Sequence, residues 1–490
     1  MSKTNENARR RLARGLVLAV SLHAFEQIAI VAILEDVVSD LNGRDFSGVI
    51  FGVYLLASIL ASVIAGTYID RHGPRGAFAF GLSSFALGLL GATLANSIEL
   101  LIAARAVQGA GGGLLLTVAY ASINIAYDEG ERPAILARLS MAWIAPGLLG
   151  PPLAAALAGL PVLEWRWVFV SLLPFAPLVA WFALPAMRGY SRSENPPARA
   201  AHPTKAGLFR SQESRRIMLA VALCAGAALL QFGSVQSQPA AMILSLLPGA
   251  GLTLFALVKL MPTGTLWLRP VLPAAIALKL ASHFAFFGTD SFIPFSLQEV
   301  RGYSLFLASL AIAPSALTWA AASVLVARFQ KDAARSVAFV RAGFVTMAIG
   351  IALALPVLRP EVSIALMFFA WGVAGFGVGC AYLSLNAIAM RETDALANDE
   401  ASTHSDGDEN KEHAHAIRTG ARVGHTAVAL NIADSLGFAF GSTAGGAILF
   451  HAARAGAAPA DQFSLVWGLH LLVAIVCVIF AGRLHSRRRP

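Results

Sequence analysis

Fourteen apolar runs of about 20 residues divide this chain, and their length constrains its fold more than any other feature. A run of that length crosses the hydrocarbon core of a bilayer as an α-helix. We therefore expect an all-α integral membrane protein. The runs lie near residues 15–34, 47–69, 76–96, 98–124, 134–160, 167–187, 217–236, 240–261, 271–296, 303–327, 337–357, 361–389, 423–450 and 464–482.

The composition also indicates a protein that crosses the bilayer many times. Hydrophobic residues make up 57% and charged residues only 13% of the 490 residues, and the mean hydropathy is +0.66. A soluble protein of this size needs far more charge to cover its surface. The net charge of +9 does not indicate a nucleic-acid partner, because the basic residues cluster between apolar runs as they do in cytoplasmic membrane loops. We interpret the three cysteines, which all lie within apolar runs, as small core residues.

The loop charges predict the orientation of the chain in the membrane. With the N-terminus inside, only five of the 37 lysines and arginines fall in outside loops, and two more lie within spans. This asymmetry predicts an even number of spans, cytoplasmic termini and a location in the plasma or inner membrane. The basic cluster Arg9–Arg14 precedes an apolar run too long for a signal peptide, so we expect a retained first span. The five outside residues are Arg44, Arg166, Arg301, Arg359 and Arg454.

Two long loops suggest how the spans are grouped. A basic cytoplasmic linker at residues 188–216 follows an N-terminal six-helix bundle at residues 1–187. Two additional helices at residues 217–270 then precede a C-terminal six-helix bundle at residues 271–490. That bundle contains an acidic cytoplasmic loop at residues 391–421, whose low-complexity composition favours disorder.

Three histidines of the acidic loop, His404, His413 and His415, raise the alternative of a metal site. Ligand spacing alone is weak support for such a site. We favour a flexible, solvated loop, and we predict neither a metal ion nor a cofactor.

An internal repeat relates the first six spans to the last six. The pattern Ala-Tyr-x-Ser-x-Asn at residues 119–124 recurs at residues 381–386, which is an offset of 262. Residues 62–78 resemble residues 323–339 at an offset of 261. Two matches at nearly one offset indicate that spans 1–6 repeat as spans 9–14, with two spans inserted between them.

One charge, Arg105, interrupts the fourth apolar run. A guanidinium at membrane depth costs roughly 3 kcal/mol or more unless another group compensates it. Four glycines follow it and remove side chains from the helix surface, so that another helix can approach closely. A buried charge beside a smooth helix surface indicates transport, and it requires a partner. The glycines are Gly109, Gly111, Gly112 and Gly113.

A short segment between the second and third runs, Gly66-Thr-Tyr-Ile-Asp70-Arg71-His-Gly73-Pro-Arg75, predicts a tight hairpin. Its glycines suit close packing and a sharp turn. Asp70 can cap a helix or pair with a cation, while Arg71 and Arg75 stay in the cytoplasm. Without other motifs, this segment would indicate only a turn that fixes the topology.

Other motifs place this segment in a wider pattern. It resembles the signature loop of the major facilitator superfamily, and Arg105-x-x-Gln108-Gly109 resembles the fourth-span motif of that superfamily. The resemblance covers nearly the whole chain in the right order. It implies two six-helix bundles and a gating role for the loop at residues 66–75.

Further motifs are similar to those of the fourteen-span drug:proton antiporters within that superfamily. The fifth run contains Gly147, Gly150 and Pro151 in a segment similar to the antiporter glycine-proline motif. Residues 164–169, Glu-Trp-Arg-Trp-Val-Phe, resemble the segment that enters the sixth span of these antiporters. Residues 25–31 resemble their first-span motif, with an acidic residue at the usual position.

That acidic residue, Glu26, is the candidate partner of Arg105. Each lies about eight residues from the outer end of its span, which is roughly 12 Å deep, and the resemblance implies that these spans touch. A change in their pairing would bind or release a proton, with His23 and Gln27 as neighbours that relay or tune it. The alternative is a static ion pair that holds two helices together. The repeat places Met367 opposite Arg105, so we expect proton coupling in the first half.

The remaining candidates are polar and aromatic side chains that line a substrate cavity. In the ninth span Lys279, His283 and Asp290 share one helical stripe. A role in lining the cavity and a structural role are about equally favoured for these three residues. Lys279 is expected to snorkel toward the membrane surface. Asp434 stands where the family usually has a basic residue. The full cavity set is Gln27, Tyr54, Gln108, Trp143, His283, Asp290, Tyr382, Asn431 and Asp434.

The sequence thus favours a secondary transporter that exports amphipathic or cationic organic compounds in exchange for protons. The partners are a small-molecule substrate, protons and the lipid bilayer, and we expect a monomer. The alternative within transport is a proton-coupled symporter or exporter of one metabolite. A membrane-embedded enzyme, a channel or a sensor fits less well, because the sequence contains no Gly-x-Ser-x-Gly, His-Glu-x-x-His or phosphate-binding loop.

Overall fold

The computed structural model describes residues 3–127, 131–190, 203–330, 332–402 and 409–485. In that part of the chain every regular element is a helix, and fourteen helical segments are long and apolar enough to cross a membrane, as the sequence predicts. By their internal contacts these residues form two units, residues 1–256 with 292–313, and residues 257–291 with 314–490. The domain boundaries proposed from the sequence stay predictions.

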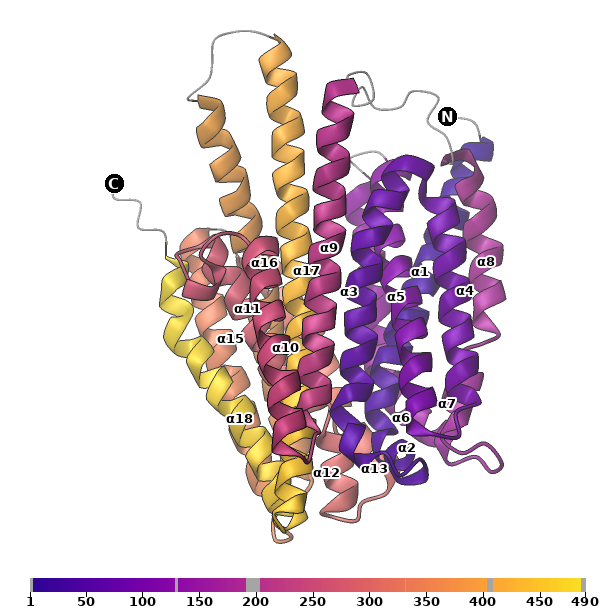
Figure 1. Cartoon of the computed structure of the whole chain (residues 1–490), viewed down its shortest axis with the longest axis vertical. Helices are drawn as coiled ribbons and strands as arrows, with labels where there is room; N and C mark the ends of the chain where they lie inside the picture. Colours follow the sequence, from indigo (N-terminus) through magenta and orange to yellow (C-terminus); the bar gives the residue numbers. More distant parts are fainter. Residues whose placement is uncertain (1–2, 128–130, 191–202, 331, 403–408, 486–490) are drawn as a thin grey trace. The chain divides into compact units, whose positions relative to one another are not determined.

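Unit 1 contains α1 to α10, apart from the last four residues of α10, and two short helices, α12 and α13, from the middle of the chain (Figure 1). α12 and α13 return to pack on α2 and α6 of this unit. The helices are α1 (Lys3–Ala32), α2 (Leu34–Asp40), η1 (Arg44–Phe46), α3 (Ser47–His72), α4 (Pro74–Thr93), α5 (Ile98–Ala126), α6 (Arg132–Ala158), α7 (Arg166–Val170), α8 (Phe175–Ala186), η2 (Met187–Tyr190), α9 (Pro203–Ser234), α10 (Pro239–Leu260), α12 (Ile293–Glu299) and α13 (Leu305–Leu310).

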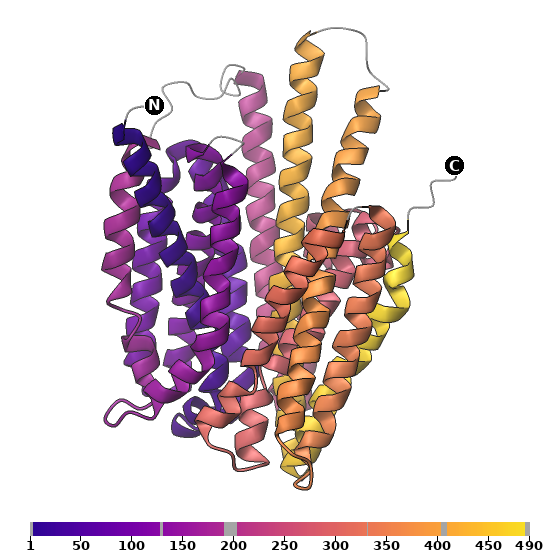
Figure 2. The ribbon, with the colours of Figure 1, turned by 180° about the vertical axis from the view of Figure 1, so that it is seen from behind.

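Unit 2 is built around the pairs α15–α16 and α11–α17 (Figure 2). Its helices are η4 (Thr265–Trp267), α11 (Leu272–Asp290), α14 (Ala313–Phe329), α15 (Ala333–Ala354), η5 (Leu355–Leu358), α16 (Ala365–Ser402), α17 (Glu409–Arg454), α18 (Pro459–Phe480) and η6 (Ala481–Leu484).

Two loops expected from the sequence are helical where the structure describes them. α9 already begins at Pro203, inside the predicted basic linker. The disorder expected across residues 391–421 is wrong for most of that range, because α16 continues to Ser402 and α17 begins at Glu409 (Figure 2). Alanine, glutamate, lysine and arginine make up about half of these polar segments, and all are strong helix formers that can extend a membrane helix into water. His404 and the side chains of His413 and His415 lie outside the described residues.

A single residue, Gly73, forms the turn of the hairpin at residues 66–75. α3 ends at His72, Gly73 has φ +77°, and α4 starts at Pro74. Glycine adopts that backbone conformation without strain, and proline suits the first turn of a helix because its missing N–H has no partner there. Gly66 and Arg75 lie in the flanking helices. The side chains of Asp70 and Arg71 lie outside the described part of the chain, so their predicted roles stay predictions.

α2 is joined to the segment that precedes α7 by polar contacts. Asp40 Oδ2 accepts hydrogen bonds from Trp165 Nε1 at 3.1 Å and from Arg166 Nη1 at 3.0 Å. Arg166 also donates to the Ala95 carbonyl oxygen at 2.7 Å. The motif at residues 164–169 therefore joins the start of α7 to the end of α2 and to the loop between α4 and α5.

α2 also carries a half-buried acid, Asp36, next to Glu35. Burial, and then the hydrogen bond and charge of Glu35, raise the pKa of Asp36 to about 7. The folded protein therefore retains a proton that the unfolded chain releases near pH 4.

Glycines set the separation of the helices around α5. A Cβ at Gly109 would lie 2.2 Å from the Tyr54 carbonyl oxygen, and one at Gly113 would lie 2.2 Å from the Ser58 carbonyl oxygen, both in α3. A Cβ at Gly111 would lie 2.3 Å from the Phe85 backbone nitrogen in α4. Two faces of α5 thus lie against neighbouring backbones, which only glycine permits at these distances.

We predict that Gly111→Ala lowers stability, because the added methyl group must push α5 away from α4. Overpacking of this kind costs about 1–3 kcal/mol. Gly251→Ala is the matched control, since its Cβ meets nothing within 4 Å and alanine is the better helix former. Thermal unfolding in detergent should show a lower midpoint for Gly111→Ala and an unchanged or higher one for Gly251→Ala. Equal midpoints for the two variants would contradict the close packing.

We also predict that Asp36 makes stability fall as the pH rises from about 4 to 7. Its folded-state pKa is raised, so the folded state binds more protons than the unfolded state in this window. Asp36→Asn removes this dependence. The thermal unfolding midpoint of the variant should therefore rise relative to that of the wild type between pH 5 and pH 8. Asp45→Asn, at an exposed position nearby, should keep the wild-type pH dependence. A wild-type curve for Asp36→Asn would refute the assignment.

Candidate functional site

The centre of unit 1 is an ion pair between α1 and α5. Arg105 Nη1 donates to Glu26 Oε1, and each side chain is only 1% exposed. The same nitrogen donates to Gln108 Oε1 at 2.9 Å, one helical turn further along α5. The structure thus brings together the two charges that the sequence placed at equal depth, and it adds Gln108 as a second acceptor.

Tyr54 of α3 covers the arginine. The Arg105 Cζ lies 4.3 Å from the centre of the Tyr54 ring, which is a cation–π distance. This contact depends on Gly109, because a side chain there would collide with the Tyr54 backbone. The glycine motif therefore makes room for the tyrosine ring that contacts the buried charge.

His23 extends the site toward α6. Its Nδ1 lies 2.8 Å from the Tyr54 hydroxyl oxygen, within hydrogen-bond distance. Its ring meets the Trp143 ring edge-on, with 5.7 Å between ring centres. A Cβ at Gly112 would lie 2.6 Å from both His23 and Tyr54, so this glycine makes room for the contact.

Three atoms of the ion-pair site have no hydrogen-bond partner among the described residues: Glu26 Oε2, Arg105 Nε and Gln108 Nε2. A buried polar atom without a partner is costly. The free oxygen of Glu26 can accept a proton without breaking the existing hydrogen bond to Arg105. Chemically, this site can bind and release a proton.

The other candidates of unit 1 lie outside this network. Gln27 is half-buried on α1, and no hydrogen bond joins it to the pair. Gly147, Gly150 and Pro151 belong to α6, where Gly150 approaches α1 with its Cβ position 3.5 Å from Ile28. Gly150 therefore lies where α6 packs on α1.

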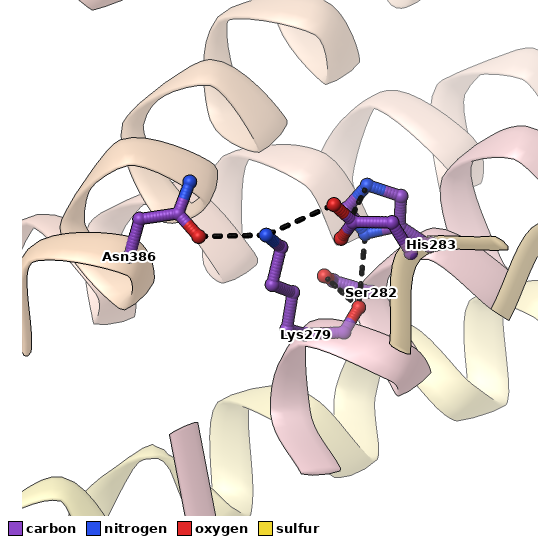
Figure 3. A network of polar contacts seen from close by, with 5 residues as sticks. Lys279, Ser282, His283 and Asn386 are labelled. Carbon is purple, nitrogen blue, oxygen red and sulfur yellow. Dashed lines mark hydrogen bonds and ion pairs between the residues drawn. The ribbon is translucent and has the colours of Figure 1, made fainter. Parts of the chain in front are cut away.

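Unit 2 contains a second buried cation, Lys279 of α11 (Figure 3). Its Nζ lies 2.9 Å from Asp434 Oδ2, donates to Asn386 Oδ1 at 2.6 Å, and lies 4.4 Å from the centre of the Tyr382 ring. The snorkelling predicted for Lys279 is therefore wrong, because partners on α16 and α17 hold the ammonium inside the unit, where it is 2% exposed. His283 completes the cluster, with its Nε2 3.2 Å from Asp434 Oδ1.

Sequence reasoning identified His283, Tyr382 and Asp434 but not their link to Lys279 and Asn386. One signal was available, since Asn386 ends the repeated Tyr-x-Ser-x-Asn pattern and Lys279 lies one turn before His283. The partners come from three helices that are far apart in the sequence, and their meeting depends on the tertiary fold.

Asp290 and Asn431 do not join this cluster. Asp290 is the last residue of α11, and its Oδ1 accepts a hydrogen bond from Trp371 Nε1 at 2.7 Å. Asn431 lies one turn before Asp434 on α17 and is exposed. The aromatic partner Trp371, which is fully buried, was not among the sequence candidates.

Each unit therefore places a buried charge cluster inside helices long enough to cross a membrane, as expected of a multi-pass membrane transporter. The chain matches the family model of the Major Facilitator Superfamily over residues 16–398. It belongs to this superfamily of transporters.

Several relatives are named as drug exporters. A probable multidrug-efflux transporter of Mycobacterium tuberculosis is 32% identical over 33% of this chain and 34% of that relative. The match therefore spans about a third of that protein's length. The multidrug efflux pump SdrM of Staphylococcus aureus is 25% identical over 78% of this chain and 82% of that relative.

Solved transporters share the fold. The crystal structure of a bacterial homologue of the human lysosomal transporter Spinster covers 99% of this chain and 100% of its own, with a TM-score of 0.64 and 14% identity. A transporter of the POT family in complex with 5-aminolevulinic acid gives a TM-score of 0.60 at 12% identity, over 98% of this chain and 97% of its own. These similarities show the fold alone.

We predict that the two charges of the ion pair depend on each other for stability. Arg105→Met leaves Glu26 buried without a cation, and loss of one partner of a buried pair costs about 3–5 kcal/mol. Glu26→Gln combined with Arg105→Met removes the stranded charge, so chemical unfolding should show that the double variant is more stable than Arg105→Met alone.

The exposed pair Glu6–Arg10 of α1 is the matched control for this experiment. Its single and double substitutions should each change stability by less than about 1 kcal/mol. If Glu26→Gln and Arg105→Met gave additive losses, the two charges would not depend on each other.

Proposed function

We propose that this protein exports amphipathic, cationic organic compounds in exchange for protons. Two considerations support the substrate class. The relatives in Mycobacterium tuberculosis and Staphylococcus aureus are named multidrug efflux proteins, and the central acid of unit 1 is a suitable partner for a cation.

The observation that carries the proposal is the buried Glu26–Arg105 pair with one free carboxylate oxygen. When a proton binds to Glu26, the ion pair becomes an arginine beside a neutral acid. The guanidinium then keeps the Tyr54 ring and the Gln108 oxygen as partners, so it need not leave the site.

Exchange follows from competition for the same acid. An organic cation and a proton both neutralise Glu26, and the arrival of one favours the release of the other. Exchange of one proton for one monovalent cation moves no net charge, so the pH gradient drives it. Each proton exchanged beyond the charge of the compound gains a further amount of about 2.3 kcal/mol per 100 mV from the membrane potential.

We further infer that both termini face the cytoplasm and that the protein works as a monomer in the plasma membrane. The concentration of basic residues on one side of the spans supports this orientation. Alternating access, with the two halves of the chain opening in turn to either side, supplies the transport cycle.

Glu26→Gln should abolish transport driven by a pH gradient while membrane insertion persists, because glutamine neither binds nor releases a proton. In inverted vesicles, proton release should follow addition of a lipophilic organic cation to the wild type and be absent in the variant. Glu99→Gln, at an exposed position in the first turn of α5, should retain proton release.

A panel of cationic, neutral and anionic compounds distinguishes the alternatives. Release on addition of cations supports the exporter. Uptake of a single metabolite into cells, with no release on addition of any compound, would instead establish a symporter. Undiminished proton release by Glu26→Gln would exclude Glu26 as the coupling acid.

A further inference from the structure

Unit 2 contains an apolar groove formed by three of its membrane-spanning helices, α14, α15 and α16. Its volume is about 430 Å³, within the range of about 300–1,000 Å³ that is typical of small-molecule sites. The groove shares no residue with the charge cluster around Lys279. The residues that line it include Pro314 and Thr318 of α14, Thr346 of α15, and Phe369, Gly372 and Phe376 of α16.

Close packing on two faces of α16 explains why the groove exists. A Cβ at Gly375 would lie 2.4 Å from Ser315 Cα in α14. A Cβ at Gly377 would lie 2.5 Å from the Gly343 carbonyl oxygen in α15. At about 100° per residue, positions two residues apart on a helix face nearly opposite directions. α14 and α15 therefore flank α16, and the arc of α16 between them is left open as the floor of the groove.

Gly372, on this open arc, has a different role from the two packing glycines. A Cβ at Gly372 would meet Pro314 Cβ and Thr318 Cγ2 at 3.7 Å, which is ordinary van der Waals contact. The approach of α14 to α16 therefore does not require a glycine at this position. What the missing side chain provides is space, because a long side chain here would extend into the groove.

The chemistry of the lining favours a hydrocarbon ligand. Thr318 Oγ1 donates to the Pro314 carbonyl oxygen at 3.0 Å, and Thr346 Oγ1 donates to the Gly343 carbonyl oxygen at 3.3 Å. Both hydroxyl hydrogens are thus already used within their own helices, and the other lining side chains are apolar. A charged or strongly polar ligand would lose its hydration here without gaining a partner.

The groove is continuous with the surface that the spans present to the bilayer. Leu317 beside Thr318 is 51% exposed, and Phe369 at the groove itself is 61% exposed. Val345 and Ile349, on either side of Thr346, are also exposed. All three helices are long and apolar enough to cross a membrane, so this surface lies among lipid tails. The hydrocarbon available to the groove is therefore the acyl chain of a membrane lipid.

We propose that the groove binds one acyl chain of a membrane phospholipid. The chain lies over Gly372 between the two threonines and contacts α14, α15 and α16 at once, so it stabilises the packing of these helices. The proposal stands on the membrane-spanning fold and on unit 2, and it does not depend on the export of cations proposed above.

The test is photo-crosslinking of the full-length protein in detergent with phosphatidylcholine that carries a diazirine on one acyl chain. Mass spectrometry locates the labelled peptides. We expect labelling of the α16 segment that contains Phe369 and Phe376 to saturate as phosphatidylcholine is added. Labelling at the exposed residues Leu472 and Ile479 of α18 should rise without saturating, because lipid there exchanges freely. If the two segments gave the same unsaturated rise, the groove would hold no specific chain and the proposal would be overturned.

Gly372→Leu fills the groove and should lose the saturable labelling of α16. Gly468→Leu is the matched control, because a Cβ at this α18 glycine meets nothing within 4 Å, and it should keep that labelling. Undiminished saturable labelling in Gly372→Leu would overturn the proposal. The comparison between α16 and α18 in the wild type needs no variant, so the test does not depend on the folding of Gly372→Leu.

Two measurements exclude other occupants of the groove. Excess tetraphenylphosphonium, a lipophilic organic cation, should leave the α16 labelling unchanged. If it displaced the lipid, the groove would be a site for the transported compound. A wild-type dimer that Gly372→Leu converts to a monomer, with no saturable labelling of α16, would instead show that a second copy of the chain occupies the groove. Either result would overturn the assignment to a phospholipid.

Discussion

Burial of charge inside membrane helices is the constraint on which this structure depends. An isolated guanidinium at that depth is costly, so Arg105 has three compensating contacts, with Glu26, Gln108 and the Tyr54 ring. These contacts require α1 and α3 to lie very close to α5. The glycines of α5 provide that approach. The glycine motif of α5 is thus needed for the contacts that compensate the buried charge of Arg105.

The two units keep the packing of their common repeat but differ in charge. Gly81 lies against α5 in unit 1 as Gly343, 262 residues later, lies against α16 in unit 2. The position equivalent to Arg105 is Met367, which is fully buried. Unit 2 instead takes its cation from α11, where the Asn386 of the repeated pattern accepts from Lys279.

The spans and the first charge pair were accessible from the sequence, because hydropathy reports burial in lipid and helical rise converts position into depth. Arg105 and Glu26 were matched by depth, and the family resemblance supplied the contact between their spans. The cluster around Lys279 was not, since its members lie on three helices and depth alone does not say which faces meet. The expected disorder at residues 391–421 was wrong because the same charged composition also favours helix.

Two ion pairs of unit 1 differ in what surrounds them. Arg166 and Asp40 form a pair at one end of the unit, and their side chains are 21% and 39% exposed. Solvent screens such a pair, so its loss changes stability little. Glu26 and Arg105 are each 1% exposed, and Glu26 Oε2 and Arg105 Nε have no hydrogen-bond partner among the described residues. Loss of either charge leaves the other buried and uncompensated, which costs about 3–5 kcal/mol. A change of charge state therefore alters the energy of the central pair far more than that of the peripheral pair.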